Sequence, residues 1–173
     1  MKYRAMTESG LILTVILFCL GVFLGGCTSR EEKLLRLQTQ RGEMIADLYD
    51  LLGEAKLATA VRDKIAQNAS STDSFDQEIA KAIADNVAGA VEMARQEMFF
   101  YCIDTVGAGR FTGCGGLEMQ KFFRRKDVRI KAVKIHLLTI RIEKTERTMG
   151  RSSGHGLVGS IFQFLKGLEG SDR

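Results

Sequence analysis

The chain has 173 residues, no proline, four cysteines and two histidines, and its formal net charge at pH 7 is +4. This length leaves room for one domain beside any targeting segment. Average usage would give about eight or nine prolines, and proline is the residue that most reliably breaks helices, so its absence favours long helices. Two histidines leave few groups for a zinc site.

An apolar run, residues 11–26, follows Lys2 and Arg4 and stops at Cys27. A short basic region, an apolar stretch and a small-residue cleavage site are the three parts of a secretory signal peptide. The last part reads Leu24-Gly25-Gly26-Cys27. This tetrapeptide resembles the lipobox of bacterial lipoproteins. The resemblance implies that residues 1–26 are a cleaved signal and that Cys27 carries acyl chains that hold the protein on a membrane.

An uncleaved signal anchor is the second interpretation, although the run is shorter than the roughly 20 apolar residues of a membrane-spanning helix. Under both interpretations the rest of the chain is exported, because the basic N-terminus stays in the cytoplasm. Thr28 is not the Asp that marks inner-membrane retention in many lipoproteins. The resemblance therefore implies the periplasmic face of the outer membrane, or the outer face of the plasma membrane in a one-membrane cell.

Two cysteines remain in the mature chain, Cys102 and Cys114, and a glycine-rich loop of 11 residues separates them. In an oxidising compartment this spacing predicts a disulfide. Closing a loop of that size stabilises a fold by about 3 kcal/mol. Two buried thiols are the alternative. No Cys-x-x-Cys pair is present, so we expect neither a metal nor a cofactor.

Two helical segments are expected before that loop. From about residue 30 to 68, apolar side chains recur at spacings of three and four, interrupted by Arg41 and Arg62, which predicts a core-facing helix of a bundle. The segment from about 75 to 105 repeats the spacing, and its bulky end, Met98 to Cys102, is expected to fill the core. Ser74 with Gln77 forms a candidate capping box between the two.

Residues 117–149 contain no glycine or proline and are expected to form a third helix. Two stretches within 128–142 alternate apolar and polar residues as a strand does, so an α+β fold is the alternative. The preferred fold class is all-α: an elongated three-helix bundle over residues 27–149, followed by a short C-terminal amphipathic helix.

Charge is unevenly distributed along the chain. Residues 28–105 carry 9 Lys and Arg against 14 Asp and Glu, whereas residues 106–173 carry 14 against 6. The densest basic run supplies candidate residues for an anionic partner. They are Lys121, Arg124, Arg125, Lys126, Arg129 and Lys131. In the simpler interpretation, these cations pair with the acidic first half and with water.

A Gly/Ser-rich linker, residues 150–156, precedes an apolar tail, residues 157–173. The tail predicts a short docking helix with Leu157, Ile161, Leu165 and Leu168 on one face and Phe162 beside it. Such a helix on a tether docks in a partner's groove, lies in a membrane interface, or folds back onto its own bundle.

These features favour a protein that is not an enzyme. There is no Gly-x-Ser-x-Gly elbow and no paired-carboxylate motif. The first hypothesis is a lipid-anchored envelope adaptor, pilot or structural component of a membrane-associated assembly, such as a secretion or transfer system, which binds an envelope protein and is compatible with homo-oligomers. The second is a sensor or inhibitory module whose basic segment binds anionic lipid or an acidic protein. Nucleic acid is not expected as a partner of an exported protein.

Overall fold

The computed structural model describes residues 29–67, 72, 75–110 and 114–150, and every regular element in these ranges is an α-helix. The helices, in chain order, are α2 (Arg30–Leu52), α3 (Ala55–Gln67), α4 (Phe75–Ala84), α5 (Gly89–Gly107), α6 (Leu117–Arg124) and α7 (Lys126–Thr148). The all-α prediction is confirmed. Residues 128–142, the candidate strands, lie within α7, so the α+β alternative is wrong.

Each of the three expected long segments is helical but divided into two helices. Gly53 adopts the left-handed conformation with φ of 88° and ends α2, which is the usual role of a glycine just after a helix. The second segment breaks after α4, where the Asn86 side chain donates to the Ala82 carbonyl at 2.8 Å. The third breaks at Arg125, whose backbone is extended. The expected uninterrupted helices are therefore corrected to three helical pairs.

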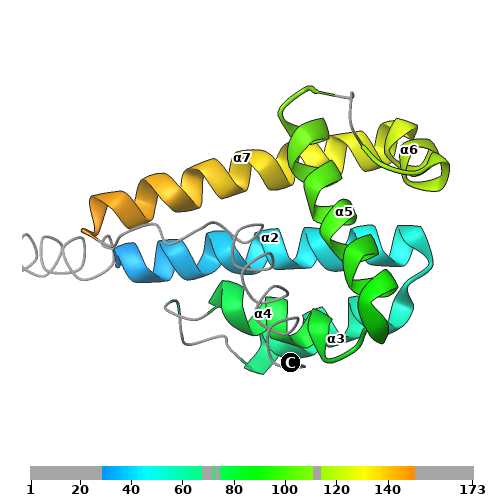
Figure 1. The fold of residues 1–173 in the computed structure, drawn as a ribbon. Helices are drawn as coiled ribbons and strands as arrows, with labels where there is room; N and C mark the ends of the chain where they lie inside the picture. The colour runs from blue at the N-terminus through cyan, green and yellow to red at the C-terminus, as the bar shows by residue number, and fades with distance from the viewer. Residues whose placement is uncertain (1–28, 68–71, 73–74, 111–113, 151–173) are drawn as a thin grey trace, which may run out of the picture.

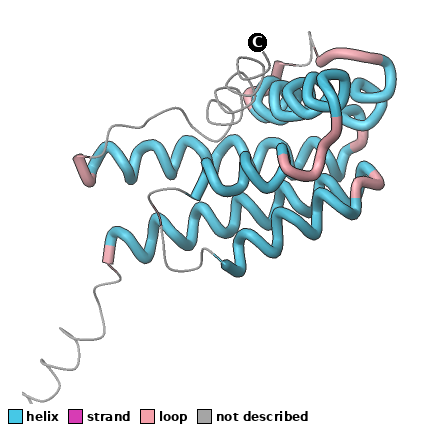
Figure 2. The backbone as a smooth tube through the Cα atoms, turned by 60° about the horizontal axis from the view of Figure 1, so that its bottom comes forward, coloured by secondary structure: helices cyan, strands magenta, loops and turns pink. Residues whose placement is uncertain are grey.

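Helix α2 is the centre of the arrangement, with α3 and α7 packed against it (Figure 1). Helices α2 and α7 are antiparallel neighbours, because Arg30 at the start of α2 donates from Nη1 to the Thr148 carbonyl at the end of α7, at 3.1 Å. Helix α5 packs against α7, and α4 packs against α3. Figure 2 shows the same helices from a second direction.

Aromatic side chains form the part of the core where α2, α5 and α6 meet. The rings of Tyr49 and Phe99 are stacked with centroids 4.7 Å apart. Phe100 and Phe123 contact Phe99 at centroid distances of 5.4 and 6.0 Å. Offset and edge-to-face pairs of this kind stabilise a core beyond the area that they bury. The core-filling role predicted for the end of the second segment is confirmed for Phe99 and Phe100, which are buried, whereas Tyr101 is exposed.

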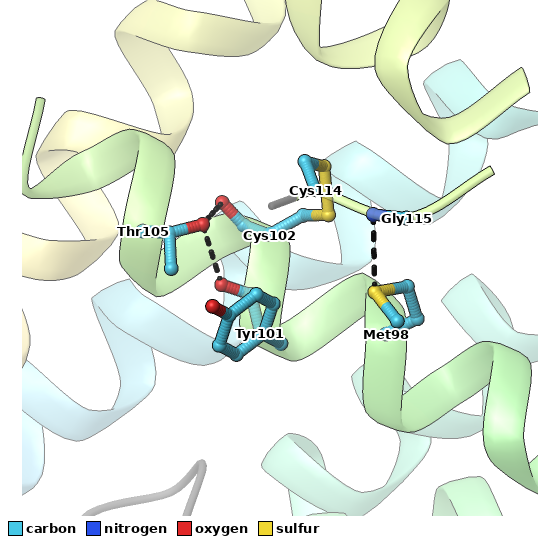
Figure 3. Close-up of a disulfide and its surroundings, with 6 residues drawn as sticks. All are labelled: Met98, Tyr101, Cys102, Thr105, Cys114 and Gly115. Carbon is cyan, nitrogen blue, oxygen red and sulfur yellow. Dashed lines mark hydrogen bonds between the residues drawn. A yellow bond between two sulfur atoms is a disulfide. The ribbon is translucent and has the colours of Figure 1, made fainter. Parts of the chain in front are cut away.

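The predicted disulfide between Cys102 and Cys114 is confirmed (Figure 3). Both cysteines are buried, and the bond ties α5 to the segment that leads into α6. The backbone N–H of Gly115 donates to the Met98 sulfur at 3.2 Å, so the same segment is held to α5 at a second point.

Several predicted features lie outside the described residues. These are the signal with Cys27, the capping residue Ser74, and the linker and docking helix from residue 151 to residue 173. Within the described ranges, none of the helices has the length and apolar character needed to cross a membrane.

Candidate interaction surface

Helix α7 has apolar residues on two opposite faces. One face is buried against α2 and α5 and consists of Val128, Ala132, Ile135, Leu138 and Ile142. The other face points to solvent and consists of Ile130, Val133, Leu137 and Ile140, which are 47, 39, 49 and 48% exposed. Spacings of three, four and three residues place these four side chains in one row along the helix. We call this row the α7 stripe.

Cations surround the α7 stripe. At 100° per residue, Lys126 and Lys144 lie in line with the stripe at its two ends, and Arg129, Lys134 and Arg141 lie along its sides. The nearby acid Asp127 is engaged by Arg125 at 2.7 Å. The outer face of α7 is therefore an apolar row within a positively charged frame.

Five of the six predicted anion-binding residues are exposed, and they lie on α6, at Arg125 and at the start of α7. They are Lys121, Arg124, Arg125, Lys126 and Arg129. The sixth, Lys131, is half-buried. Lys131 donates to Asp47 of α2 at 2.6 Å, and this hydrogen bond, assisted by Arg62, lowers the pKa of Asp47.

Arg125 is exposed and is also engaged within the chain. Besides its ion pair with Asp127, its guanidinium lies 5.8 Å from the centroid of the Phe122 ring. Pairing with the acidic first half, the simpler interpretation of the basic run, thus describes Lys131.

A buried ion pair fastens α2 to the start of α4. Arg41 is 1% exposed and pairs with Asp76, while the neighbouring Gln38 donates to the Thr72 carbonyl at 3.2 Å. Burial raises the pKa of Asp76, and the charge of Arg41 opposes that rise. The side chains of Arg41 and Asp76 are 1 and 16% exposed, so the pair is mostly shielded from solvent and holds the two helices together. The sequence showed Arg41 only as an interruption of the apolar spacing.

A second enclosed network joins α2 to α5. The Tyr49 hydroxyl donates to the Gln96 side-chain oxygen at 2.8 Å, and the Gln96 amide donates to Glu92 at 2.7 Å. Burial raises the pKa of Tyr49 well above its usual range, and the charges of Glu54 and Glu92 raise it further. A neutral hydroxyl without access to solvent acts here as a structural donor.

Sequence reasoning missed the α7 stripe. Ile130 and Ile140 lie in the two stretches that alternate as a strand does, and the spacing of a single helix does not show which face a neighbour will cover. A helical wheel of residues 126–148 would have shown two apolar faces, one of them framed by Lys and Arg.

Comparisons with protein-family models, with curated proteins and with solved structures found no match to this chain.

Proposed function

We propose that this chain is a non-catalytic, lipid-anchored envelope protein that acts as an adaptor in a membrane-associated assembly. The observation that carries the proposal is the α7 stripe within its frame of cations. Single exposed aliphatic residues are normal on a protein surface, but contiguous exposed apolar patches mark interaction sites. Four large aliphatic side chains in one row, each at least 39% exposed, form such a patch.

The partner surface that fits the stripe is an amphipathic helix with acidic flanks. From Ile130 to Ile140 the stripe is about 15 Å long, which matches about three turns of a partner helix. Apolar residues at spacings of three and four would pack on the stripe, and Asp or Glu beside them would meet the cations of the frame. Charge complementarity of this kind sets the orientation and specificity of a complex.

Two other occupants fit the stripe less well. A second copy would bring an identical ring of Lys and Arg against the first, and like charges at an interface oppose association. The tail of this chain, residues 157–173, carries Lys166 and Arg173 against Glu169 and Asp172, so it offers no net negative charge to the frame. We therefore assign the stripe to an acidic helix of another envelope protein.

The lipid anchor supports a protein partner at this position. Cys27 lies three residues before the start of α2, and that start lies beside the end of α7. Along α7 the stripe lies roughly 12 to 27 Å from that end, at 1.5 Å per residue. A bundle held at this end presents the stripe beside the membrane, where another envelope protein can reach it.

Capture of the partner tests the adaptor proposal. The full chain, tagged and purified from membranes of its own host in mild detergent, is compared with the variant Val133→Gln/Leu137→Gln, which makes the stripe polar without changing its charge. The matched control is Val91→Gln/Leu117→Gln, which replaces two exposed aliphatic residues on α5 and α6. We expect a specific set of co-purifying proteins to be lost from the stripe variant and kept by the control.

Two results would contradict parts of this proposal. Co-purifying proteins that remain with the stripe variant would exclude the stripe as the docking surface. Capture that increases after deletion of residues 151–173 would show that the tail covers the stripe. The anchor has its own test, since the intact mass must correspond to a chain that begins at Cys27 with added acyl groups, and a mass that retains residues 1–26 would refute lipidation.

A further inference from the structure

An open cleft of about 450 Å³ lies between the first turns of α2 and the last turns of α7. Four of its lining residues are cations, Arg30 and Lys33 from α2 and Arg141 and Lys144 from α7, and none of the lining residues is acidic. Glu31 and Glu32, in the same turn of α2, are not among the residues that line it. We call this cleft the basic cleft.

The antiparallel pairing of α2 and α7 creates the basic cleft. The lining residues of α2 lie at i, i+3 and i+7, from Arg30 to Leu37. Those of α7 lie at i, i+3, i+4 and i+7, from Arg141 to Thr148. Two rows at this spacing each follow one face of a helix. Arg30 is held at the rim by its hydrogen bond to the Thr148 carbonyl at 3.1 Å.

The polar groups of the cleft favour an anion. The hydroxyls of Thr145 and Thr148 donate to backbone carbonyls of α7 at 2.8 and 2.7 Å, so their protons are already engaged. The donors that remain for a ligand are the ammonium groups of Lys33 and Lys144 and the guanidinium groups. Guanidinium groups bind phosphate oxygens in pairs, and ammonium groups add point charge. Leu37 offers an apolar contact between them.

The position of the cleft identifies the source of the anion. Cys27 lies three residues before Arg30, and an extended chain of that length spans at most about 11 Å. If Cys27 carries the acyl anchor, as proposed above, the cleft lies at the membrane surface. Lys and Arg next to a membrane are attracted to anionic headgroups, and this attraction decays over about one Debye length from the surface.

We propose that the basic cleft binds the phosphate headgroup of an anionic phospholipid such as phosphatidylglycerol. This contact would fix the orientation of the bundle on the membrane, which a flexible acyl tether at Cys27 does not do alone. The proposal rests on the proposed lipid anchor. The cleft shares Arg141 and Lys144 with the cations around the α7 stripe, but it contains none of the four apolar residues of the stripe.

Native mass spectrometry of the full chain in neutral detergent tests the proposal. Phosphatidylglycerol, phosphatidylcholine and free glycerol phosphate are titrated separately against three proteins: the wild type, Lys33→Gln/Lys144→Gln, and the matched control Lys121→Gln/Arg124→Gln. The control removes the same charge from two exposed positions on α6, which lie outside the cleft. We expect the wild type to prefer phosphatidylglycerol, the cleft variant to bind it about twenty-five-fold more weakly, at about five-fold per cation, and the control to stay within about two-fold.

Three results would overturn the proposal. Equal loss in both variants would mean that net charge alone attracts the lipid. Equal binding of the two phospholipids by the wild type would exclude recognition of an anionic headgroup. Glycerol phosphate bound as tightly as phosphatidylglycerol would make a free phosphate ester the ligand.

The same spectra separate this proposal from the proposed function. An unacylated chain that still prefers phosphatidylglycerol would refute the anchor and support the cleft, whereas an acylated chain without the preference would refute the cleft and support the anchor. Partner capture through the α7 stripe is measured on different variants and is independent of both.

Discussion

Removal of the disulfide is expected to lower the free energy of unfolding by about 3 kcal/mol. Cys102 and Cys114 are 12 residues apart, and the chain-entropy model gives about 3 kcal/mol for a closed loop of that size. The bond constrains the unfolded chain more than it adds native contacts, so its loss should appear mainly as a shift of the transition. For a bundle of this size, a loss of 3 kcal/mol corresponds to a fall in Tm of about 10 °C.

Thermal unfolding of the full chain, followed by far-UV circular dichroism, measures this shift. The wild type is compared with Cys102→Ala/Cys114→Ala, each with and without a phosphine reductant. Alanine suits these positions because both cysteines are buried. We expect the reductant to lower the Tm of the wild type to nearly that of the variant and to leave the variant unchanged. A variant that melts within about 2 °C of the oxidised wild type would refute the entropic argument, since the bond would then not destabilise the unfolded chain by the expected amount.

Three further substitutions test the interior by the same unfolding measurement. Arg41→Met leaves the Asp76 carboxylate without its counter-ion and should cost about 3 kcal/mol at pH 7. Burial already raises the pKa of Asp76, and Arg41 opposes this rise, so the pKa of Asp76 should be higher still in the variant. The free energy of unfolding of the variant should therefore fall more steeply than that of the wild type as pH increases from 4 to 7. A difference between the two proteins that does not change with pH would contradict this. Tyr49→Phe leaves the Gln96 oxygen without its donor and should lower the free energy of unfolding by about 1 to 2 kcal/mol. A loss near zero would show that this hydrogen bond does not stabilise the fold. Gly107→Ala should lower the free energy of unfolding by about 1 to 3 kcal/mol, because the new Cβ would lie 2.6 to 2.8 Å from atoms of α7. An unchanged Tm would show that α5 and α7 can move apart at this position.

The helical fold class could be predicted from the sequence because its signals are local. Spacings of three and four and the absence of proline apply to each segment alone. The breaks were missed for the same reason. Apolar spacing continues from α2 into α3 across Gly53, because both helices bury a face in the same core. At Arg125 one extended residue suffices to separate α6 from α7, and no turn-forming residue marks it.

The interaction surface depends on contacts between distant residues and was only partly predictable. Basic residues were selected by their density in the sequence, but Lys131 pairs with Asp47, 84 residues away, and so does not belong to the exposed set. Only the packing of α2 and α5 on one side of α7 shows that its other apolar side remains exposed. The disulfide was predictable, in contrast, because Cys102 and Cys114 lie close in the sequence and flank a short glycine-rich loop.

The two proposed surfaces impose one geometric condition on the bundle. If α7 lay flat in the membrane interface, the α7 stripe would contact lipid and the basic cleft would lie at the same depth, so the stripe could not bind an acidic helix. If the bundle stands on its anchored end, the basic cleft meets headgroups while the stripe extends roughly 12 to 27 Å from that end. Vesicle binding by Val133→Gln/Leu137→Gln separates the two orientations. Binding equal to that of the wild type requires the upright bundle, and weakened binding requires the flat one, because only then do those side chains contact lipid.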